Sequence, residues 1–258
     1  MPTGSRVGFS LPAGAPEALT LFLACSAAGV ATAPLNPDIT EPEAAFELEH
    51  LGIKALVVMA GTEKDAAARA AKAMGIEVLS LAKDSSVCGL FGPLALAADN
   101  APPAAADLAL LLLTSGTTSK AKVVPLKRTP ADVCLNLMPL FHIHGLLVNG
   151  VVSLASGASV VAAPGLDAPA TVLRWLASDA KATWYSAVPT IHMLLISACK
   201  ASGAPVPAVG AGNGWPGSGG NAVLSRNCST ALLPAVAAEL ESQCGMSVLA
   251  TYAMSESY

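Results

Sequence analysis

Short apolar runs alternate with helix-like segments along the N-terminal part of the chain. Residues 6–11, 54–59 and 77–80 are short runs with a strand-like pattern, and 54–59 is the one with adjacent β-branched residues. Segments with helical character separate them, and several end at glycine, which readily closes a helix. These predicted helices cover residues 17–28, 41–51 and 63–74. With a turn at residues 34–37, this order predicts βαβ units around a parallel sheet.

A second alternating series follows towards the C-terminus. Its predicted strands cover residues 159–162, 182–186 and 247–250. Its predicted helices cover residues 168–178, 189–200 and 233–244. We therefore predict an α/β protein built from two parallel-sheet subdomains.

Two stretches interrupt the alternation. Residues 84–106 are rich in alanine, proline and glycine, which is typical of a linker, and residues 203–221 resemble a flexible surface loop. The predicted domains are a first α/β subdomain at residues 1–83, the linker at 84–106, and a second α/β subdomain at 107–258.

Composition narrows the possible partners. Hydrophobic residues make up 53% of the 258, charged residues only 12%, and the formal net charge is -4. A basic face for nucleic acid is therefore not expected, and no protein partner can be inferred. The apolar runs at 18–33 and 146–163 contain small polar residues and are interpreted as core rather than membrane spans. The N-terminus lacks a signal-peptide pattern, and the six cysteines form no C-x-x-C pair, so we expect reduced thiols and a cytoplasmic location.

The clearest chemical signal lies at residues 110–124, which read LLLLTSGTTSKAKVV. An apolar strand runs into hydroxyl side chains, one glycine and two lysines. Hydroxyls and exposed backbone N–H groups bind phosphate oxygens, Gly116 allows a close backbone approach, and lysines neutralise charge. The spacing is not that of a Walker loop. A polar turn is the alternative, but the two lysines favour phosphate.

This segment resembles the phosphate loop of the adenylate-forming superfamily, usually T-S-G-T-T-G-x-P-K-G. The resemblance implies that it binds the phosphates of ATP, with Lys122 also catalytic. The implied phosphate-binding residues are Thr114, Ser115, Gly116, Thr117, Thr118, Ser119 and Lys122. Ser119 replaces the usual glycine, as in the oxalate–CoA ligase branch, while Ala121 and Val123 replace proline and glycine. A β-branched residue at the last position crowds the loop.

Residues 139–146, PLFHIHGL, resemble the P-L-F-H-x-x-G-L segment of the same family. The resemblance implies that His142 lies near the substrate carboxylate as a catalytic residue. Two other interpretations are a core histidine and a metal pair, because on a strand His142 and His144 would point to one face. No acid or cysteine follows closely to complete a metal site, which disfavours metal.

Two further segments resemble family motifs. Residues 251–257, TYAMSES, resemble Y-G-M-T-E, with Ala253 in place of glycine. The resemblance implies that Tyr252 stacks on adenine, Ser255 reaches the α-phosphate and Glu256 holds Mg²⁺, a role suited to a carboxylate beside phosphates. Residues 227–234, NCSTALLP, resemble the turn that lines the adenine pocket. That turn includes Ser229, Thr230 and Ala231.

The resemblance covers nearly the whole chain and implies the stacked parallel-sheet N-terminal domain of an adenylate-forming enzyme. Family members continue with an aspartate that binds ribose, a hinge and a C-terminal lid domain bearing a catalytic lysine. These features are expected to be absent here. The helix that usually follows the phosphate loop is also expected to be missing, because only residues 127–138 separate Leu126 from Pro139.

The implied function is that of an AMP-forming acid–thiol ligase. MgATP activates a carboxylate to an acyl-adenylate, and coenzyme A then forms the thioester. The Ser119 and Ala253 variants favour a small dicarboxylate such as oxalate, although a cinnamate or a fatty acid remains an alternative. The rival interpretations are a non-catalytic nucleotide-binding remnant and a chain that does not fold. A peroxisomal location also stays open for the full-length family.

Overall fold

The computed structural model divides the chain into two compact units, Met1–Thr114 and Ser115–Tyr258, which are considered separately below. The residues that the structure describes are 4–82, 108–111, 132–163, 182–202 and 224–251. The predicted linker, the Gly/Pro-rich stretch and the predicted helix at 168–178 lie outside these ranges. Within them, no helix is long and apolar enough to cross a membrane.

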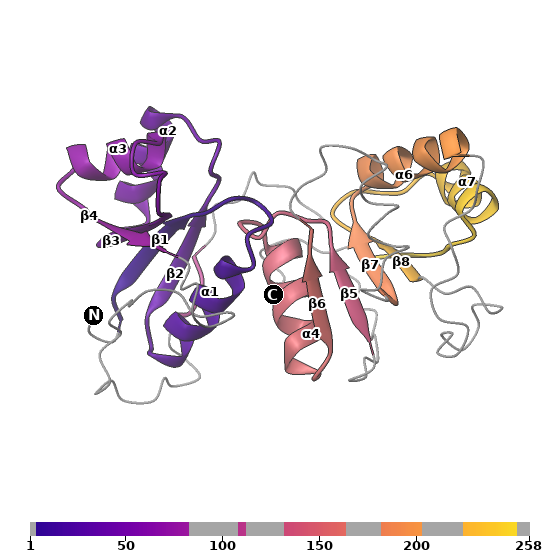
Figure 1. Ribbon diagram of the computed structural model, residues 1–258, viewed down its shortest axis with the longest axis horizontal. Helices are drawn as coiled ribbons and strands as arrows, with labels where there is room; N and C mark the ends of the chain where they lie inside the picture. Colours follow the sequence, from indigo (N-terminus) through magenta and orange to yellow (C-terminus); the bar gives the residue numbers. More distant parts are fainter. Residues whose placement is uncertain (1–3, 83–107, 112–131, 164–181, 203–223, 252–258) are drawn as a thin grey trace. The chain divides into compact units, whose positions relative to one another are not determined.

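The first unit is a four-stranded parallel sheet in the order β2-β1-β3-β4. Its strands are β1 Arg6–Ser10, β2 Ala31–Leu35, β3 Ala55–Met59 and β4 Glu77–Leu81. Its helices are α1 Glu17–Ala27, α2 Glu41–His50 and α3 Ala66–Ala73. Helices α2 and α3 lie on one face of the sheet and α1 on the other (Figure 1). Right-handed crossovers require this, because the chain moves from β1 to β2 in one direction across the sheet and from β2 to β3 and β4 in the other.

Strand β2 differs from the turn predicted at residues 34–37. Pro34 lies inside this strand, in register with Phe9 of β1. Proline cannot donate a ladder hydrogen bond, so the sequence argues against a strand there. The structure accommodates Pro34 because β2 pairs along its length with β1, and among the described residues the bridge on its other side involves Thr32, with Leu110, and not Pro34.

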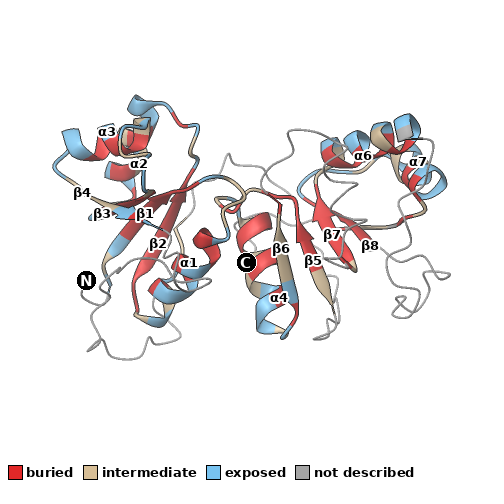
Figure 2. Ribbon diagram, viewed as in Figure 1, coloured by how far each residue is buried: buried red, intermediate tan, exposed pale blue. Residues whose placement is uncertain are grey.

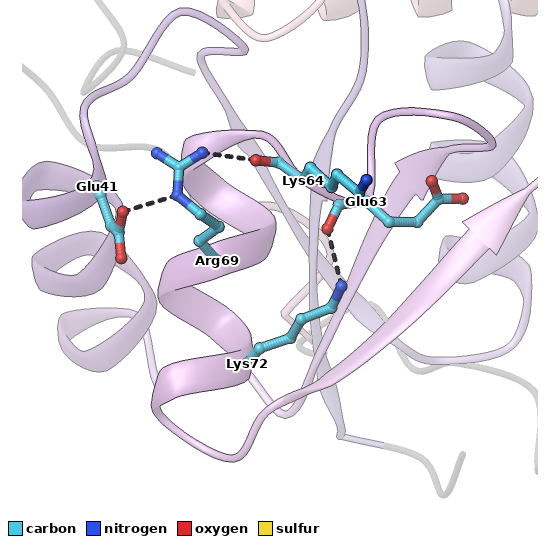
Figure 3. A network of polar contacts seen from close by, with 5 residues as sticks. All are labelled: Glu41, Glu63, Lys64, Arg69 and Lys72. Atoms are coloured by element: carbon cyan, nitrogen blue, oxygen red, sulfur yellow. Dashed lines mark hydrogen bonds and ion pairs between the residues drawn. The ribbon is translucent and has the colours of Figure 1, made fainter.

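A network of exposed polar contacts joins α2, α3 and the turn before α3 (Figure 3). Arg69 of α3 donates from Nε to Glu41 of α2 at 2.9 Å and also to the carbonyl of Lys64. Lys72 donates to the carbonyl of Glu63 at 2.8 Å. These side chains are exposed, so their contribution to stability is small beside that of the apolar contacts between the helices and the sheet. The network's main effect is to join α3 to α2 and to the turn at residues 63–64.

The second unit is a five-stranded parallel sheet in the order β6-β5-β7-β8-β9. Its strands are β5 Val133–Asn136, β6 Ser159–Ala162, β7 Trp184–Ala187, β8 Leu224–Asn227 and β9 Ser247–Ala250. Its helices are the π-helix η1 His144–Val151, which continues into α4 Val152–Ala155, then α6 Pro189–Ser202 and α7 Pro234–Cys244. Strands β5 and β8 and the π-helix are absent from the predicted series, whereas the strands at 159–162 and 247–250 are confirmed.

The two faces of the second sheet have different coverings. Leu135 and Tyr185 belong to a core cluster with buried residues of α6 and α7, such as Leu195 and Leu240. The chain moves from β5 to β6 in one direction across the sheet and from β7 to β9 in the other. Right-handed crossovers therefore place η1 and α4 on the face opposite α6 and α7. Figure 2 shows that β7 is buried and that β6, at the edge of the sheet, is only partly buried, while the outer sides of the helices are exposed.

Gly145 explains how η1 can begin so soon after β5. A Cβ atom at this position would lie 2.2 Å from the Pro139 carbonyl oxygen and 2.7 Å from that of Met138. Both contacts are with backbone atoms, which cannot rotate away. Only glycine lets the helix turn back this closely on the segment it follows.

We expect Gly145→Ala to lower the free energy of unfolding by about 3 kcal/mol or more, because the added methyl group forces the backbone apart. Urea unfolding followed by circular dichroism measures this loss. The control is Gly245→Ala, since Gly245 has a positive φ of 67° but no atom within 4 Å of its missing Cβ. That change is expected to cost only about 1 kcal/mol of left-handed strain. Equal losses in the two variants would contradict the close approach at Gly145.

A buried tyrosine–histidine pair crosses the core between β7 and α6. The hydroxyl of Tyr185 lies 3.0 Å from Nδ1 of His192, and both residues are fully buried. Burial lowers the pKa of His192 to about 4 and raises the pKa of Tyr185. In the unfolded chain a histidine has a pKa of about 6.5, so below that pH the unfolded state binds a proton that the folded state excludes. The contribution of neutral His192 to the free energy of unfolding is thus fully present above about pH 6.5. It decreases as the pH falls from about 6.5 to about 4.

We expect His192→Gln to make stability less dependent on pH between pH 7 and pH 5. The wild-type slope contains a contribution from His192 of at most about 1.4 kcal/mol per pH unit, which glutamine removes. Urea unfolding at pH 7, 6 and 5 measures the slope. Gln243→Ala, which alters an exposed residue of α7 that does not titrate, is the control and should keep the wild-type slope. An unchanged slope for His192→Gln would show that this histidine is not held neutral.

Candidate functional site

Four predicted site residues fall within the described part of the chain. These are His142, Ser229, Thr230 and Ala231. The others lie outside it, namely Thr114, Ser115, Gly116, Thr117, Thr118, Ser119, Lys122, Tyr252, Ala253, Ser255 and Glu256. All four described residues follow the carboxyl ends of strands in the second sheet, where parallel sheets usually bind ligands.

A row of polar residues crosses the second sheet at this end. Asn136 of β5 is in register with Ser186 of β7, and Ser186 is in register with Arg226 of β8. Residues in register on parallel strands point to the same face. This face is opposite the Leu135 and Tyr185 core, so it is the face that η1 covers. All three residues are buried, so their polar atoms need partners within the protein or from a ligand.

Two side chains of η1 supply such partners. His144 Nε2 lies 2.7 Å from the Ser186 hydroxyl. Asn149 donates from Nδ2 to Asn136 Oδ1 at 2.9 Å and to the Ser186 carbonyl at 3.2 Å. Asn136 in turn binds the backbone of Met138 through both its amide nitrogen and its oxygen. These bonds attach η1 to Asn136 and Ser186. We name Asn136, Ser186 and Arg226 the carboxyl-edge row.

His142 and His144 occupy different environments and are not on a strand. The chain between β5 and η1 forms a turn, in which His142 is exposed and its ring lies 4.5 Å from that of Phe141. His144, the first residue of η1, is 3% exposed. Within the described residues no group of three possible metal ligands occurs. The expectation that a strand would point both rings to one face does not apply to this turn.

Burial keeps His144 neutral. Loss of solvent, and then the nearby positive charge of Arg226, lower the pKa of His144 to about 4. A neutral imidazole carries one donor and one acceptor nitrogen. Nε2 faces the Ser186 hydroxyl, and Nδ1 lies 3.3 Å from the Ser229 hydroxyl. Since hydroxyl groups both donate and accept, either tautomer satisfies the two contacts.

The turn after β8 is held from three sides. Cys228 donates its N–H to the carbonyl of Ala187 at the end of β7. Asn227 donates from Nδ2 to the Thr230 carbonyl at 2.7 Å. Ser229 has a positive φ of 74°, a conformation that costs a non-glycine residue about 1 kcal/mol or more. With His144 beside its hydroxyl, the turn is fixed while Ser229, Thr230 and Ala231 remain exposed.

The next strand end adjoins this turn. Thr251 follows β9, and its N–H donates to the Asn227 carbonyl at 2.8 Å. The Thr251 hydroxyl donates to the same carbonyl and accepts from Arg226 Nε at 2.9 Å. The residue that precedes Tyr252 in the sequence is thus attached to the strand that leads to Ser229. Two of the motif segments therefore begin at neighbouring strand ends.

Sequence reasoning missed most of this framework. The sequence gives His144 no role beyond a core histidine or a metal pair with His142, and it gives none to Asn136, Asn149, Ser186 and Arg226. One signal was available, because polar residues stand at or next to the last position of the otherwise apolar segments at 133–136 and 184–187. In a buried parallel strand such a residue needs a partner and often marks the ligand edge.

Comparisons with known proteins agree with this architecture. A family model described as AMP-binding enzyme matches residues 2–258. The chain is 32% identical to an oxalate–CoA ligase of Arabidopsis thaliana, with 93% of this chain and 48% of the ligase covered. It is 29% identical to an oxalate–CoA ligase of Saccharomyces cerevisiae, with 93% and 49% covered. The chain therefore spans about half the length of these curated relatives.

Solved structures show the same fold. The crystal structure of apo MatB from Rhodopseudomonas palustris superposes with a TM-score of 0.73 at 26% identity, covering 99% of this chain and 51% of MatB. The ATP-bound form of MatB gives 0.72 at 27% identity, covering 98% and 50%. The predicted α/β class and the resemblance to adenylate-forming enzymes are thereby confirmed. Because the family model matches almost every residue, the chain belongs to the AMP-binding enzyme family.

Proposed function

We propose that this chain is the nucleotide-binding part of an AMP-forming acid–CoA ligase. In the proposed reaction a carboxylate attacks the α-phosphate of MgATP, which releases pyrophosphate and leaves an acyl-adenylate. The thiol of coenzyme A then displaces AMP to form a thioester. Because the chain spans about half of its curated relatives, the activity of a whole protein is part of the proposal.

One observation carries the proposal. In a chain that matches the AMP-binding family throughout, the Ser229 turn and the segment leading to Tyr252 start from adjacent, hydrogen-bonded strand ends. The His142 segment follows β5 in the same sheet. The ATP-bound form of the similar MatB supports ATP as the nucleotide.

The described residues fit a nucleotide at this edge. Asn227 Oδ1 is buried and has no hydrogen-bond partner among the described residues, so it offers an acceptor beside the exposed Ser229 turn. The small side chain of Ala231 allows a flat base to approach the backbone. We assign adenine to this turn, with Tyr252 stacked on it and Ser255 at the α-phosphate. The β- and γ-phosphates are assigned to Lys122 and to Thr114, Ser115, Gly116, Thr117, Thr118 and Ser119.

Mg²⁺ would neutralise the phosphate charge that develops during the reaction, and Glu256 is the residue proposed to hold it. Lys122 adds a second positive charge, and His142 is placed beside the attacking carboxylate. The protein's own contribution is to position anions and stabilise charge at fixed points. His144 acts through the turn, because its neutral ring holds Ser229 in a strained conformation.

Oxalate is the proposed acid. Two similar proteins carry the name oxalate–CoA ligase, and the Ser119 and Ala253 variants agree with that branch. A 4-coumarate–CoA ligase of rice is also similar, at 28% identity, over 64% of this chain. A substituted cinnamate is therefore the competing substrate.

We expect the purified, folded chain to catalyse ATP–pyrophosphate exchange that depends on oxalate more strongly than on coumarate. Exchange of labelled pyrophosphate into ATP measures the adenylation step without coenzyme A. A preference for coumarate would contradict oxalate as the acid. A folded chain that binds MgATP without exchange would reduce the proposal to nucleotide binding, and one that binds no MgATP would refute it.

Lys122→Ala and Glu256→Ala are each expected to weaken MgATP binding at least tenfold, since each removes a charged contact to phosphate or metal. Isothermal titration calorimetry measures the dissociation constants. The control is Lys200→Ala, which removes an exposed ion pair with Glu239 between α6 and α7. Wild-type affinity in both test variants would rule out these two roles.

His144→Phe is expected to weaken MgATP binding roughly fivefold, because it keeps the ring but removes the hydrogen bond to Ser229. The same titration and a thermal melt measure affinity and folding. His50→Phe makes the same change at a histidine at the end of α2 and should bind normally. A folded His144→Phe chain with unchanged affinity would show that the Ser229 turn does not contact nucleotide.

A further inference from the structure

Arg226 is the one member of the carboxyl-edge row to which we have assigned no role. It is 8% exposed, on β8, next to Ser186 in the register. Its Nε donates to Thr251, which lies just beyond the end of β9. The guanidinium is therefore held at the carboxyl edge of the sheet, on the face that η1 covers.

The charge of Arg226 is unbalanced in the described part of the chain. The ion pairs among those residues are Arg69 with Glu41 and Lys200 with Glu239, and neither involves Arg226. A guanidinium has five N–H donors, and the bond to Thr251 uses one. A buried cation costs several kcal/mol unless an anion and further hydrogen bonds compensate it.

A purely structural role explains Arg226 poorly. The single bond to Thr251 joins β8 to the end of β9, and Thr251 already makes this connection through two bonds to the Asn227 carbonyl. A neutral donor such as glutamine could bond Thr251 without bringing a charge into the site. The positive charge also disfavours protonation of the neighbouring His144, which therefore adds no second cation beside Arg226.

We propose that Arg226 binds the non-reacting anionic group of the acid, and so selects small acids with a second carboxylate. This inference rests on the proposed function for the site that it completes. A hydrocarbon tail beside Arg226 would leave the buried charge uncompensated, whereas a carboxylate accepts two parallel N–H bonds from the guanidinium fork. A phosphate oxygen of ATP offers the same chemistry, so the test separates the two sources.

The test measures binding of sodium oxalate, sodium propionate and MgATP separately by isothermal titration calorimetry. We expect the wild-type chain to bind oxalate more tightly than propionate. Arg226→Gln should weaken oxalate binding at least tenfold, because it removes a charge-assisted contact, and should change propionate and MgATP affinities less than twofold. Arg69→Gln removes an arginine of equal charge from the α2–α3 network and should leave all three affinities unchanged.

Arg226→Lys covers the case in which the glutamine variant does not fold. Lysine keeps the charge but lacks the planar fork, so oxalate binding should weaken at least threefold. Thermal melts with and without oxalate report folding and binding together, because a ligand that binds only the folded state raises the melting temperature. Oxalate should raise that temperature less in the lysine variant than in the wild type.

Three results would overturn the proposal. They are oxalate affinity within twofold of wild type in a folded variant, loss of MgATP affinity while oxalate affinity is kept, and a wild-type chain that does not prefer oxalate to propionate. A chain that binds oxalate through Arg226 but does not bind MgATP would confirm the anion site and refute the nucleotide function. The two hypotheses therefore fail in different measurements.

Discussion

The carboxyl edge of the second sheet depends on one buried imidazole that stays uncharged. His144 joins the Ser186 hydroxyl of β7 to the Ser229 hydroxyl of the turn after β8. Protonation would turn both ring nitrogens into donors and place a second positive charge near Arg226. Loss of solvent makes that state unfavourable, so the pKa is about 4 and the ring is neutral at physiological pH. The strained Ser229 turn is thereby coupled to the packing of η1.

The contacts of His144 also depend on where the backbone starts η1. His144 reaches Ser186 because η1 starts close to the end of β5, and the helix can start there because residue 145 is glycine. The π-helical form of η1 also places Asn149 over Asn136 and Ser186. Such helices are rare and frequently occur at functional sites. Arg226 continues the same row as its one charged member, which makes this edge suited to an anion.

Much of the fold followed from the sequence, since periodicity and glycine positions predicted α1, α2, α6 and α7 to within a few residues. Strand β2 was missed because Pro34 argues against a strand unless its edge position is known. The strand β8 was missed because Arg226 and Asn227 interrupt its apolar pattern. Motif resemblance predicts Ser229 as a site residue, but the hydrogen bond to His144 spans 85 residues of sequence, and no local pattern predicts such a contact. Register between strands brought the carboxyl-edge row together, and register is a property of the folded sheet.

Nucleotide binding is the proposed role of the edge that His144 organises. A crystal structure of the chain with a non-hydrolysable ATP analogue tests it most directly. Adenine is expected against residues 229–231, with Asn227 Oδ1 within hydrogen-bonding distance of the base and the His144 contacts to Ser186 and Ser229 intact. An analogue bound away from the ends of β8 and β9, or a His144 ring turned away from Ser229 in the complex, would contradict it.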